Sequence, residues 1–183
     1  DNRPDWAFAL HGGAGAVAGR DYTETEKHLA KLAAACKYKL ERGGKALNIV
    51  EFAVAELESC GLYVAGRGSA PNSAGYVELD ASIMDGPTRN AGAVAAITDV
   101  VNPIRVARRV MEATPHVMLA GEGAARFAAE QGFALGPFRQ AAIAQQADAL
   151  RADPAAAKVF LRPDGSAPAT SAISARASRV SDL

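Results

Sequence analysis

A glycine-rich turn near the N-terminus is the first stretch of this sequence whose residues could do chemistry. The apolar run from Ala7 to Leu10 ends abruptly in the sequence HGGAGA, residues 11–16. Glycines lose more conformational freedom on folding than other residues, so their use here indicates that the bare backbone is needed. Such a turn could bind an anion through outward-pointing N–H groups, line another kind of active site, or serve as a tight structural turn.

Two phosphate-binding motifs do not fit this turn. It lacks the complete G-x-G-x-x-G pattern, and no acidic residue ends a second strand about 20 residues later, as a dinucleotide site requires. It also lacks the G-K-[ST] sequence of a P-loop. A nucleotide site is therefore the weakest of the three interpretations, and the sequence leaves the other two open.

The other polar residues form no complete catalytic set. His11, His28 and His116 show no H-x-x-x-H or H-E-x-x-H spacing, which favours structural histidines over a metal site. Asp80 and Asp85 could act as a general acid and base, but at a strand end such residues more often fix the backbone donors of a turn. No serine lies in a G-x-S-x-G elbow, and no nucleophile has an evident base.

Composition indicates a soluble globular protein and excludes several classes. The chain has 183 residues, of which 49% are hydrophobic and 22% charged, and its formal net charge is zero. A neutral balance argues against binding to nucleic acid or to a membrane surface. Two cysteines, Cys36 and Cys60, are too few for a disulfide framework, and no apolar run of about 18 residues could span a membrane. Without a signal-peptide pattern, we expect a cytoplasmic protein.

The elements that must position these residues follow from hydrophobic periodicity and from glycine punctuation. Thr23 and Glu26 suit a capping box at the start of the first helix. The resulting order is typical of a mixed α and β fold with buried strands. The sequence predicts a strand at 6–10, helices at 23–44 and 45–61, strands at 76–86 and 91–100, a helix at 102–116, and a further strand and helix within 116–132.

After Gly136 the periodicity fades. The next stretch suits a loose helix that breaks at Pro154, and the Ser-, Ala- and Pro-rich remainder suits a flexible or extended tail. We therefore predict a folded part at residues 1–136 and a linker at residues 137–183. The strong elements alone would make a small sheet, which indicates one part of a larger fold.

Several motifs in order resemble the plant-type L-asparaginases, also called isoaspartyl aminopeptidases. The motifs are HGGAGA, YVAGRGSAPNSAGYVELDASIMDG, and the stretch from AGAVAAITDV to AAEQG, so that the likeness runs from about Ala9 to Gly132. Family members are N-terminal-nucleophile hydrolases, made as a precursor that cuts itself into α and β chains. The new N-terminal threonine of β is the nucleophile, and its own α-amine is the base. The resemblance implies that this chain is the α subunit, with its linker preceding the cleavage site.

The resemblance also implies a fold, a partner and a reaction. The fold would be α+β, a four-layer αββα sandwich completed by the separate β chain, and αβ units would pair into an (αβ)₂ heterotetramer. A lone α chain would expose sheet edges and apolar faces, so we expect it to be unstable without β. The reaction would be hydrolysis of L-asparagine, of β-aspartyl (isoaspartyl) dipeptides, or of both, with no organic cofactor.

By the same resemblance, four positions of this chain would support the active site. His11, Gly12 and Gly13 would line the cleavage site, with His11 in a positioning role rather than as a proton carrier. The family usually reads Phe-Asn-Ala-Gly where this chain has Tyr63-Val64-Ala65-Gly66, and that asparagine reaches towards the active site. Val64 cannot make its hydrogen bond. Either another residue makes that contact, or the site differs in rate or substrate choice.

The family also has a loop that wraps a sodium ion with main-chain carbonyls. Oxygen ligands suit a hard cation. Backbone ligation does not depend on side chains, however, so a sharp loop without an ion stays open as an alternative. The matching positions here are Leu57, Glu58, Cys60, Tyr63, Ala65 and Arg67.

Two alternative functions stay open at this point. Because Val64 stands where the family has asparagine, the chain could be a non-catalytic relative or a binding module that uses the glycine turn for an anion. It could also be part of another threonine hydrolase, such as a glycosylasparaginase. The sequence VELDASIMDG favours the asparaginases over the glycosylasparaginases.

Overall fold

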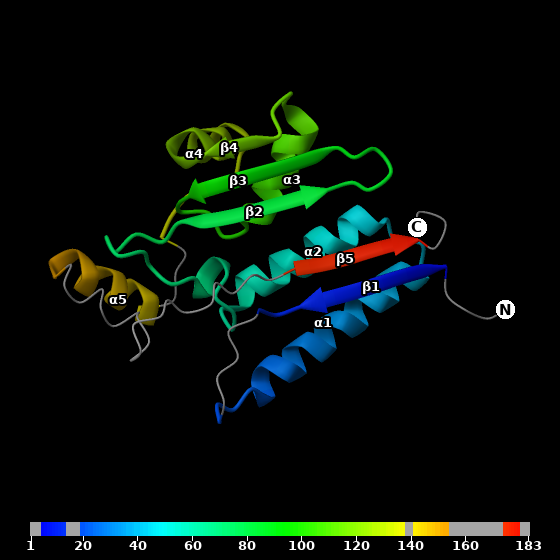
Figure 1. Ribbon diagram of the computed structural model, residues 1–183, viewed down its shortest axis with the longest axis horizontal. Coiled ribbons are helices and arrows are strands. Elements are labelled where there is room, and N and C mark those ends of the chain that lie inside the picture. Colours follow the sequence, from blue (N-terminus) through cyan, green and yellow to red (C-terminus); the bar gives the residue numbers. More distant parts are fainter. Residues whose placement is uncertain (1–4, 14–18, 138–140, 154–173, 180–183) are drawn as a thin grey trace.

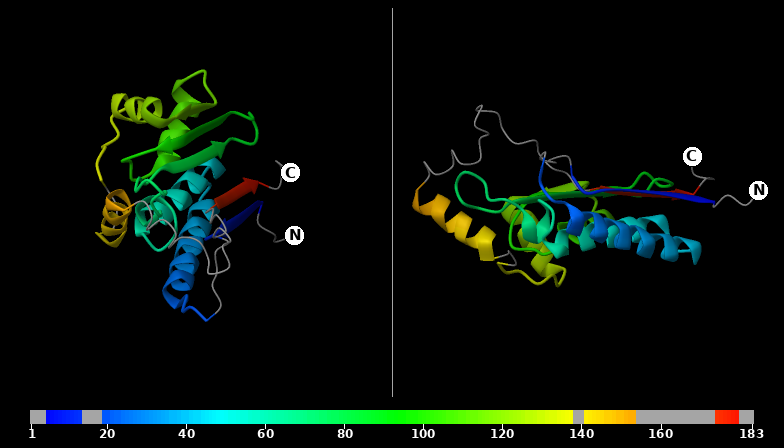
Figure 2. Two further views of the ribbon diagram at one scale, coloured as in Figure 1. Left: turned by 60° about the vertical axis from the view of Figure 1, so that its left-hand side comes forward. Right: turned by 90° about the horizontal axis from the view of Figure 1, so that it is seen from below.

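The computed structural model describes residues 5–13, 19–137, 141–153 and 174–179 and has an α+β arrangement (Figure 1). The described strands form two small sheets, one with two strands and one with three. Seen from below, the strands lie in one layer and the helices lie on one side of it (Figure 2). The described part is thus one layer of strands covered by one layer of helices.

The first sheet pairs strands from the two ends of the chain. Strand β1 (Trp6–His11) runs antiparallel to β5 (Ser174–Arg179), with the backbone of His11 opposite that of Ser174. Helices α1 (Thr23–Glu41) and α2 (Ala46–Cys60) cover one face of this sheet. Burial alternates along β1 because only that face meets the helices. Their shared core consists of Leu32, Cys36, Leu40, Ile49, Ala53, Leu57 and Tyr63.

The second sheet has its own helices. Strand β2 (Leu79–Met84) runs antiparallel to β3 (Ala91–Ile97), and β4 (Met118–Ala120) adds to β3 in parallel. Helix α3 (Pro103–Ala113) begins with proline, which suits a first turn because the N–H there has no helical partner. Helix α4 (Gly121–Glu130) follows β4 directly.

Helix α2 connects the two sheets, because one of its sides packs into the core under the first sheet and the other into the core under the second. Ile49, Ala53 and Leu57 belong to the core under the first sheet. Ala55 belongs to the core under the second sheet, and Leu47, Val50 and Val54 pack against that core. No hydrogen-bonded strand pair links the two sheets within the described residues. The relative position of the sheets therefore depends on α2.

The opposite face of both sheets is bare of any described helix or strand (Figure 2). Met84 and Met118 are more than half exposed on it, at 56% and 53%. His11 and Arg176 are polar side chains on this face. Many of the others are small, and small or apolar side chains are typical of a surface that packs against another layer. They include Ala7, Ala9, Ser82, Ala91, Ala93, Ala95 and Ala120.

The predicted helices and strands are confirmed, with differences at their ends. Gly61, at φ 74°, ends α2 in the left-handed conformation that favours glycine. The predicted capping box is wrong. Tyr22 is the N-cap of α1 and makes no side-chain cap bond, and Asp21 accepts the N–H of Thr23 at 2.9 Å. Asp21 provides an acceptor two residues earlier, so Thr23 begins the helix instead of capping it.

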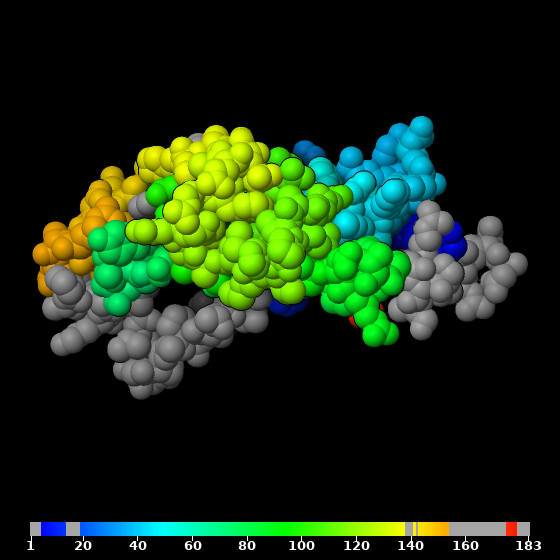
Figure 3. Space-filling model, turned by 90° about the horizontal axis from the view of Figure 1, so that it is seen from above, coloured from blue at the N-terminus to red at the C-terminus, as the bar shows by residue number. Residues whose placement is uncertain are grey.

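Both carboxylates of the LDASIMDG stretch fix backbone donors, as predicted. Asp85 accepts the hydroxyl of Thr88 at 2.6 Å and its N–H at 3.4 Å, and so stabilises the β2–β3 turn. This turn projects from the surface in the space-filling view (Figure 3). Asp80 accepts the N–H of Ala96 at 2.8 Å, where the backbone of Ala96 has an unusual φ of 49°.

Within segment 137–183, two of the described stretches are regular. The predicted helix is confirmed as α5 (Ala141–Ala152), and Ala147 and Leu150 are buried. Arg151 donates to the carbonyl of Gly75 and lies over the ring of Tyr76. The other regular part is β5. Pro154 and most of the remaining tail lie outside the described residues, so the linker and its boundary after residue 136 stay predictions.

Among the described helices, none combines the length and the apolar character that crossing a bilayer requires.

The close approach of β3 to α3 gives a stability test at Gly92. A Cβ there would lie 2.1 Å from Ala107 O and 2.6 Å from Met111 N, so Gly92→Ala must push α3 away from the sheet. We expect the free energy of unfolding to fall by about 1–3 kcal/mol, measured by urea denaturation. Gly86→Ala is the matched control, since no atom lies within 4 Å of its Cβ position. Equal denaturation midpoints for the two variants would contradict the packing described.

Candidate active site

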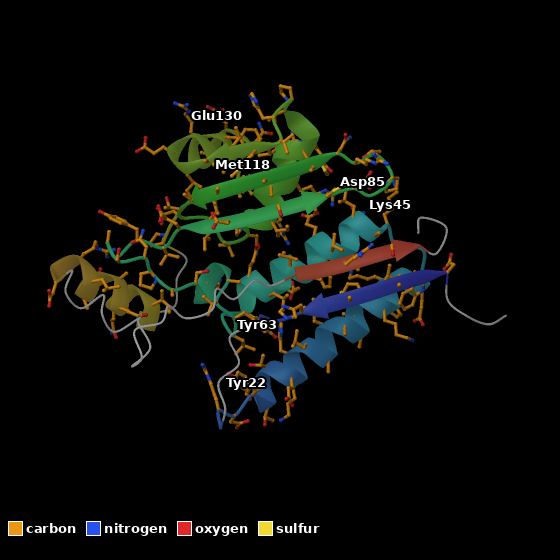
Figure 4. All side chains as sticks on the ribbon, in the orientation of Figure 1. Tyr22, Lys45, Tyr63, Asp85, Met118 and Glu130 are labelled. Carbon is orange, nitrogen blue, oxygen red and sulfur yellow. The ribbon has the colours of Figure 1, made fainter. Side chains whose placement is uncertain are left out.

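The turn after β1 lies directly against the loop after α2 (Figure 4). A Cβ on Gly12 would come within 2.9 Å of Tyr63 Cε1 and 3.2 Å of Leu29 Cδ1, so a side chain at position 12 would displace one of these two side chains. Gly13 has φ 115°, and its N–H donates to Nδ1 of His11 at 3.2 Å. The exposed imidazole of His11 is thereby held against its own turn.

Tyr63 is held at its hydroxyl by helix α1. The hydroxyl donates to Thr25 O at 3.4 Å, and its oxygen lies 3.1 Å from His28 Nδ1. A phenol has one proton to donate. When the Tyr63 hydroxyl donates to Thr25 O, its oxygen can only accept, and the Nδ1–H of His28 donates to it. The side chain is buried, and burial raises the pKa of Tyr63 to about 12. Tyr63 is therefore a neutral phenol at physiological pH.

Carbonyl oxygens of the end of α2 and of the following loop lie close to two glycines of that loop. A Cβ on Gly66, at φ 51°, would lie 2.3 Å from Glu58 O. A Cβ on Gly68 would lie 2.2 Å from Tyr63 O and 2.9 Å from Gly61 O. A side chain at position 66 or 68 would occupy the space next to these oxygens, so glycine keeps that space open. Oxygen donors suit a hard cation such as sodium. The described residues include no cluster of His, Cys, Asp and Glu that could hold a metal ion.

The other positions matched to a sodium ion are compatible with this donor set. Leu57 O accepts the thiol of Cys60 at 3.4 Å, and Ala65 O accepts the N–H of Gly68 at 3.0 Å. Burial raises the pKa of Cys60, so its sulfur stays a thiol. Arg67 lies in the short helix η1 (Gly66–Gly68) that closes the loop.

The Glu58 side chain has a role that the sequence did not indicate. Its Oε1 accepts the N–H of Ile104 at 3.1 Å, and its Oε2 accepts from Asn102 Nδ2 at 3.2 Å. The end of α2 is thereby tied to the first turn of α3. Asn102 also donates to Ala55 O at 3.0 Å. Burial raises the pKa of Glu58 to about 8, although both hydrogen bonds and the charge of Arg105 act in the opposite direction.

Val64 projects from this loop into a cleft between the two sheets. Its side chain is 54% exposed, whereas Tyr63 beside it is only 5% exposed. The cleft has a volume of about 1780 Å³ and is lined by residues of α2, β2, β3, β5 and the loop. Its lining includes Val64, and His11, Gly12 and Gly13 lie outside it. The turn and Val64 are thus connected through Tyr63 rather than through a shared cavity wall.

Comparison with known proteins shows which family this chain is similar to. A family model described as asparaginase matches residues 4–171. The chain is 44% identical over 132 residues to an isoaspartyl peptidase of Salmonella typhimurium, covering 69% of this chain and 42% of the relative. It is 46% identical over 127 residues to a plant-type L-asparaginase of Pyrococcus horikoshii, with the same two coverages.

A human relative gives the same result. The chain is 46% identical over 124 residues to an isoaspartyl peptidase/L-asparaginase of Homo sapiens, covering 67% of this chain and 40% of the relative. The matched part of the chain thus spans less than half the length of these curated relatives.

The Glu58 contacts can be tested by stability. Glu58→Ala leaves the buried N–H of Ile104 without its acceptor. It also removes one of the acceptors of the Asn102 amide, which keeps Ala55 O and Ser59 Oγ. We expect the free energy of unfolding to fall by about 2–3 kcal/mol in urea denaturation. Glu56→Ala, at an exposed position of the same helix, is the control and should change it by less than about 0.5 kcal/mol. Similar losses in both variants would contradict the proposed tie between α2 and α3.

Proposed function

Since the chain belongs to the asparaginase family, we propose that it is the α subunit of an amidohydrolase acting on L-asparagine, on β-aspartyl dipeptides, or on both. The observation that carries this proposal is the contact of the Gly12 backbone with the loop that presents Val64, in a chain 44% identical to an isoaspartyl peptidase. The nucleophile is a threonine at the N-terminus of a β subunit cut from the same precursor.

In the proposed reaction, the threonine hydroxyl oxygen attacks the carbonyl carbon of the side-chain amide, and its proton moves to the threonine's own α-amine. The tetrahedral intermediate expels ammonia, or the amine of the second residue of a dipeptide, and that amine takes up the proton. The product at this stage is a β-aspartyl ester of threonine. Water then hydrolyses the ester, while donors on the β subunit stabilise the oxyanion in both steps.

This chain contributes positioning rather than proton transfer. Gly12 and Gly13 let its backbone approach the cleavage site closely, and His11 holds the N–H of Gly13. The α-carboxylate and α-amine of the substrate are bound mainly by β. Val64 contacts the part of the substrate that β does not bind, and its isopropyl group offers no hydrogen bond there.

The β subunit covers the bare face of both sheets, so that the two chains together form the four-layer αββα sandwich. The exposure of Met84 and Met118 supports this part of the proposal, because a lone chain would leave them in water. Segment 137–183 is the linker before the cut, the αβ units pair as (αβ)₂, and the enzyme works in the cytoplasm.

The loop after α2 holds a sodium ion through main-chain carbonyls, and no organic cofactor takes part. The ion would neutralise carbonyl dipoles that face one another where Gly66 and Gly68 fold the loop. It would therefore stabilise the loop that presents Val64. The carbonyls are those of Leu57, Glu58, Cys60, Tyr63, Ala65 and Arg67.

An activity assay tests the proposed function. The chain and its β partner, produced together from one precursor, should release aspartate from L-asparagine or from β-aspartyl dipeptides. A precursor in which alanine replaces the first threonine of β should stay uncut and release none, because both steps need the hydroxyl. A wild-type enzyme that is fully cut but releases no aspartate from either substrate would overturn the proposal.

The role of Val64 can be tested separately with Val64→Asn. The amide restores a hydrogen-bonding group in the cleft, so kcat/KM for L-asparagine should change relative to that for a β-aspartyl dipeptide, by about tenfold. Leu62→Asn is the matched control, because Leu62 is exposed on the same loop but lies outside the cleft lining. If Val64→Asn leaves the ratio of the two kcat/KM values unchanged, Val64 does not contact substrate.

A further inference from the structure

We propose that the aromatic ring of Tyr63 is a positioning residue of this site, a wedge that sets the distance between the His-Gly-Gly turn and the loop carrying Val64. This inference rests on the proposed function, since it concerns the site of that reaction. It assigns a role to the side chain of Tyr63, whereas the sodium ion would use only its main-chain carbonyl.

The ring occupies the space that Gly12 leaves. The Cβ position of Gly12 faces Tyr63 Cε1 at 2.9 Å and both methyl groups of Leu29 at 3.2 and 3.5 Å. The end of β1 is therefore stopped by two side chains, one from the loop and one from α1. A smaller residue at position 63 would let the turn move towards α1, and a larger one at position 12 would push the ring away.

The hydroxyl keeps the wedge from turning. Thr25 and His28 both lie near the start of α1, and both are within hydrogen-bonding distance of the phenol oxygen, at 3.4 and 3.1 Å. Tyr63 thus contacts two segments besides its own loop, namely the turn at Gly12 and the start of α1 (Figure 4). The family that this chain resembles usually has phenylalanine in the matching motif, so the resemblance implies that the ring, rather than the hydroxyl, is the part needed here.

The position of Val64 depends on this wedge. Tyr63 points into the core under the first sheet, and Val64, the next residue, is 54% exposed in the cleft. The two neighbouring side chains thus lie on different sides of the loop, one in the core and one in the cleft. A shift of the ring would therefore move Val64 in relation to the turn, and such shifts of about 1 Å can cost a hundredfold in rate.

Four variants of the co-produced, cut enzyme test the wedge. Tyr63→Phe keeps the ring, so its kcat should stay within about threefold of wild type. Tyr63→Leu and Gly12→Ala each disturb the contact, so each should lower kcat at least about tenfold while KM changes less. The double variant Gly12→Ala/Tyr63→Leu should recover kcat relative to Gly12→Ala alone, because leucine makes room for the added methyl. Tyr38→Leu, at an exposed tyrosine of α1, is the control.

The outcomes separate positioning from a purely structural role. If Tyr63→Leu yields less active enzyme but its kcat per active site is unchanged, the wedge is overturned. The wedge is also overturned if the losses of kcat in Gly12→Ala and Tyr63→Leu multiply in the double variant instead of partly cancelling. Wild-type kcat in Tyr63→Leu would also overturn it, while leaving the proposed function in place. A cut wild-type enzyme without activity on either substrate would instead overturn the proposed function, and the wedge with it.

Discussion

The structure depends on one constraint, which is that its strands are covered by helices on one face only. Leu79, Ile83 and Val94 face the helices and are buried, whereas Met84 and Met118 face outward and are exposed. Only the buried face provides hydrophobic stabilisation within the described chain. In the proposed function, a β subunit covers this bare face and supplies the nucleophile that this chain does not provide.

Helix α2 and its C-terminal end connect this constraint to the candidate site. The helix packs into both cores, and Glu58 near its end accepts the N–H of Ile104 at the start of α3. Arg108 of α3 also pairs with Glu51 of α2. The loop that follows α2 carries Tyr63 and Val64, so the geometry of the cleft is fixed by the same helix that joins the sheets. Buried polar contacts of this kind define one arrangement because leaving them unpaired is costly.

Local patterns allowed much of the fold to be predicted. Apolar spacing located α1 to α4, and glycine located the ends of α1, α2 and α4, because both act within a few residues of the chain. Strand β5 gave no such signal, since SARASR alternates polar residues with small ones and becomes a strand only by pairing with β1. The capping box at Thr23 failed for a local reason, the nearby carboxylate of Asp21.

The contacts of the candidate site were harder to predict, because they join residues far apart in the sequence. His28 and Tyr63 are 35 residues apart, and Glu58 and Ile104 are 46 apart. No periodicity connects such pairs, and the sequence alone indicated only a structural histidine at position 28. The resemblance to a family located the turn and the loop, but the packing of Tyr63 on Gly12 followed only from the coordinates.

The most direct test of this account is whether the bare face binds the second chain. Ala93 lies on that face of β3, opposite Ser82 and Met118 on the neighbouring strands. When Ala93→Glu is produced together with the β partner, the account predicts that the two chains no longer co-elute in size-exclusion chromatography. The control Ala129→Glu, at an exposed position of α4, should still co-elute. Normal co-elution of Ala93→Glu with its partner would contradict the account.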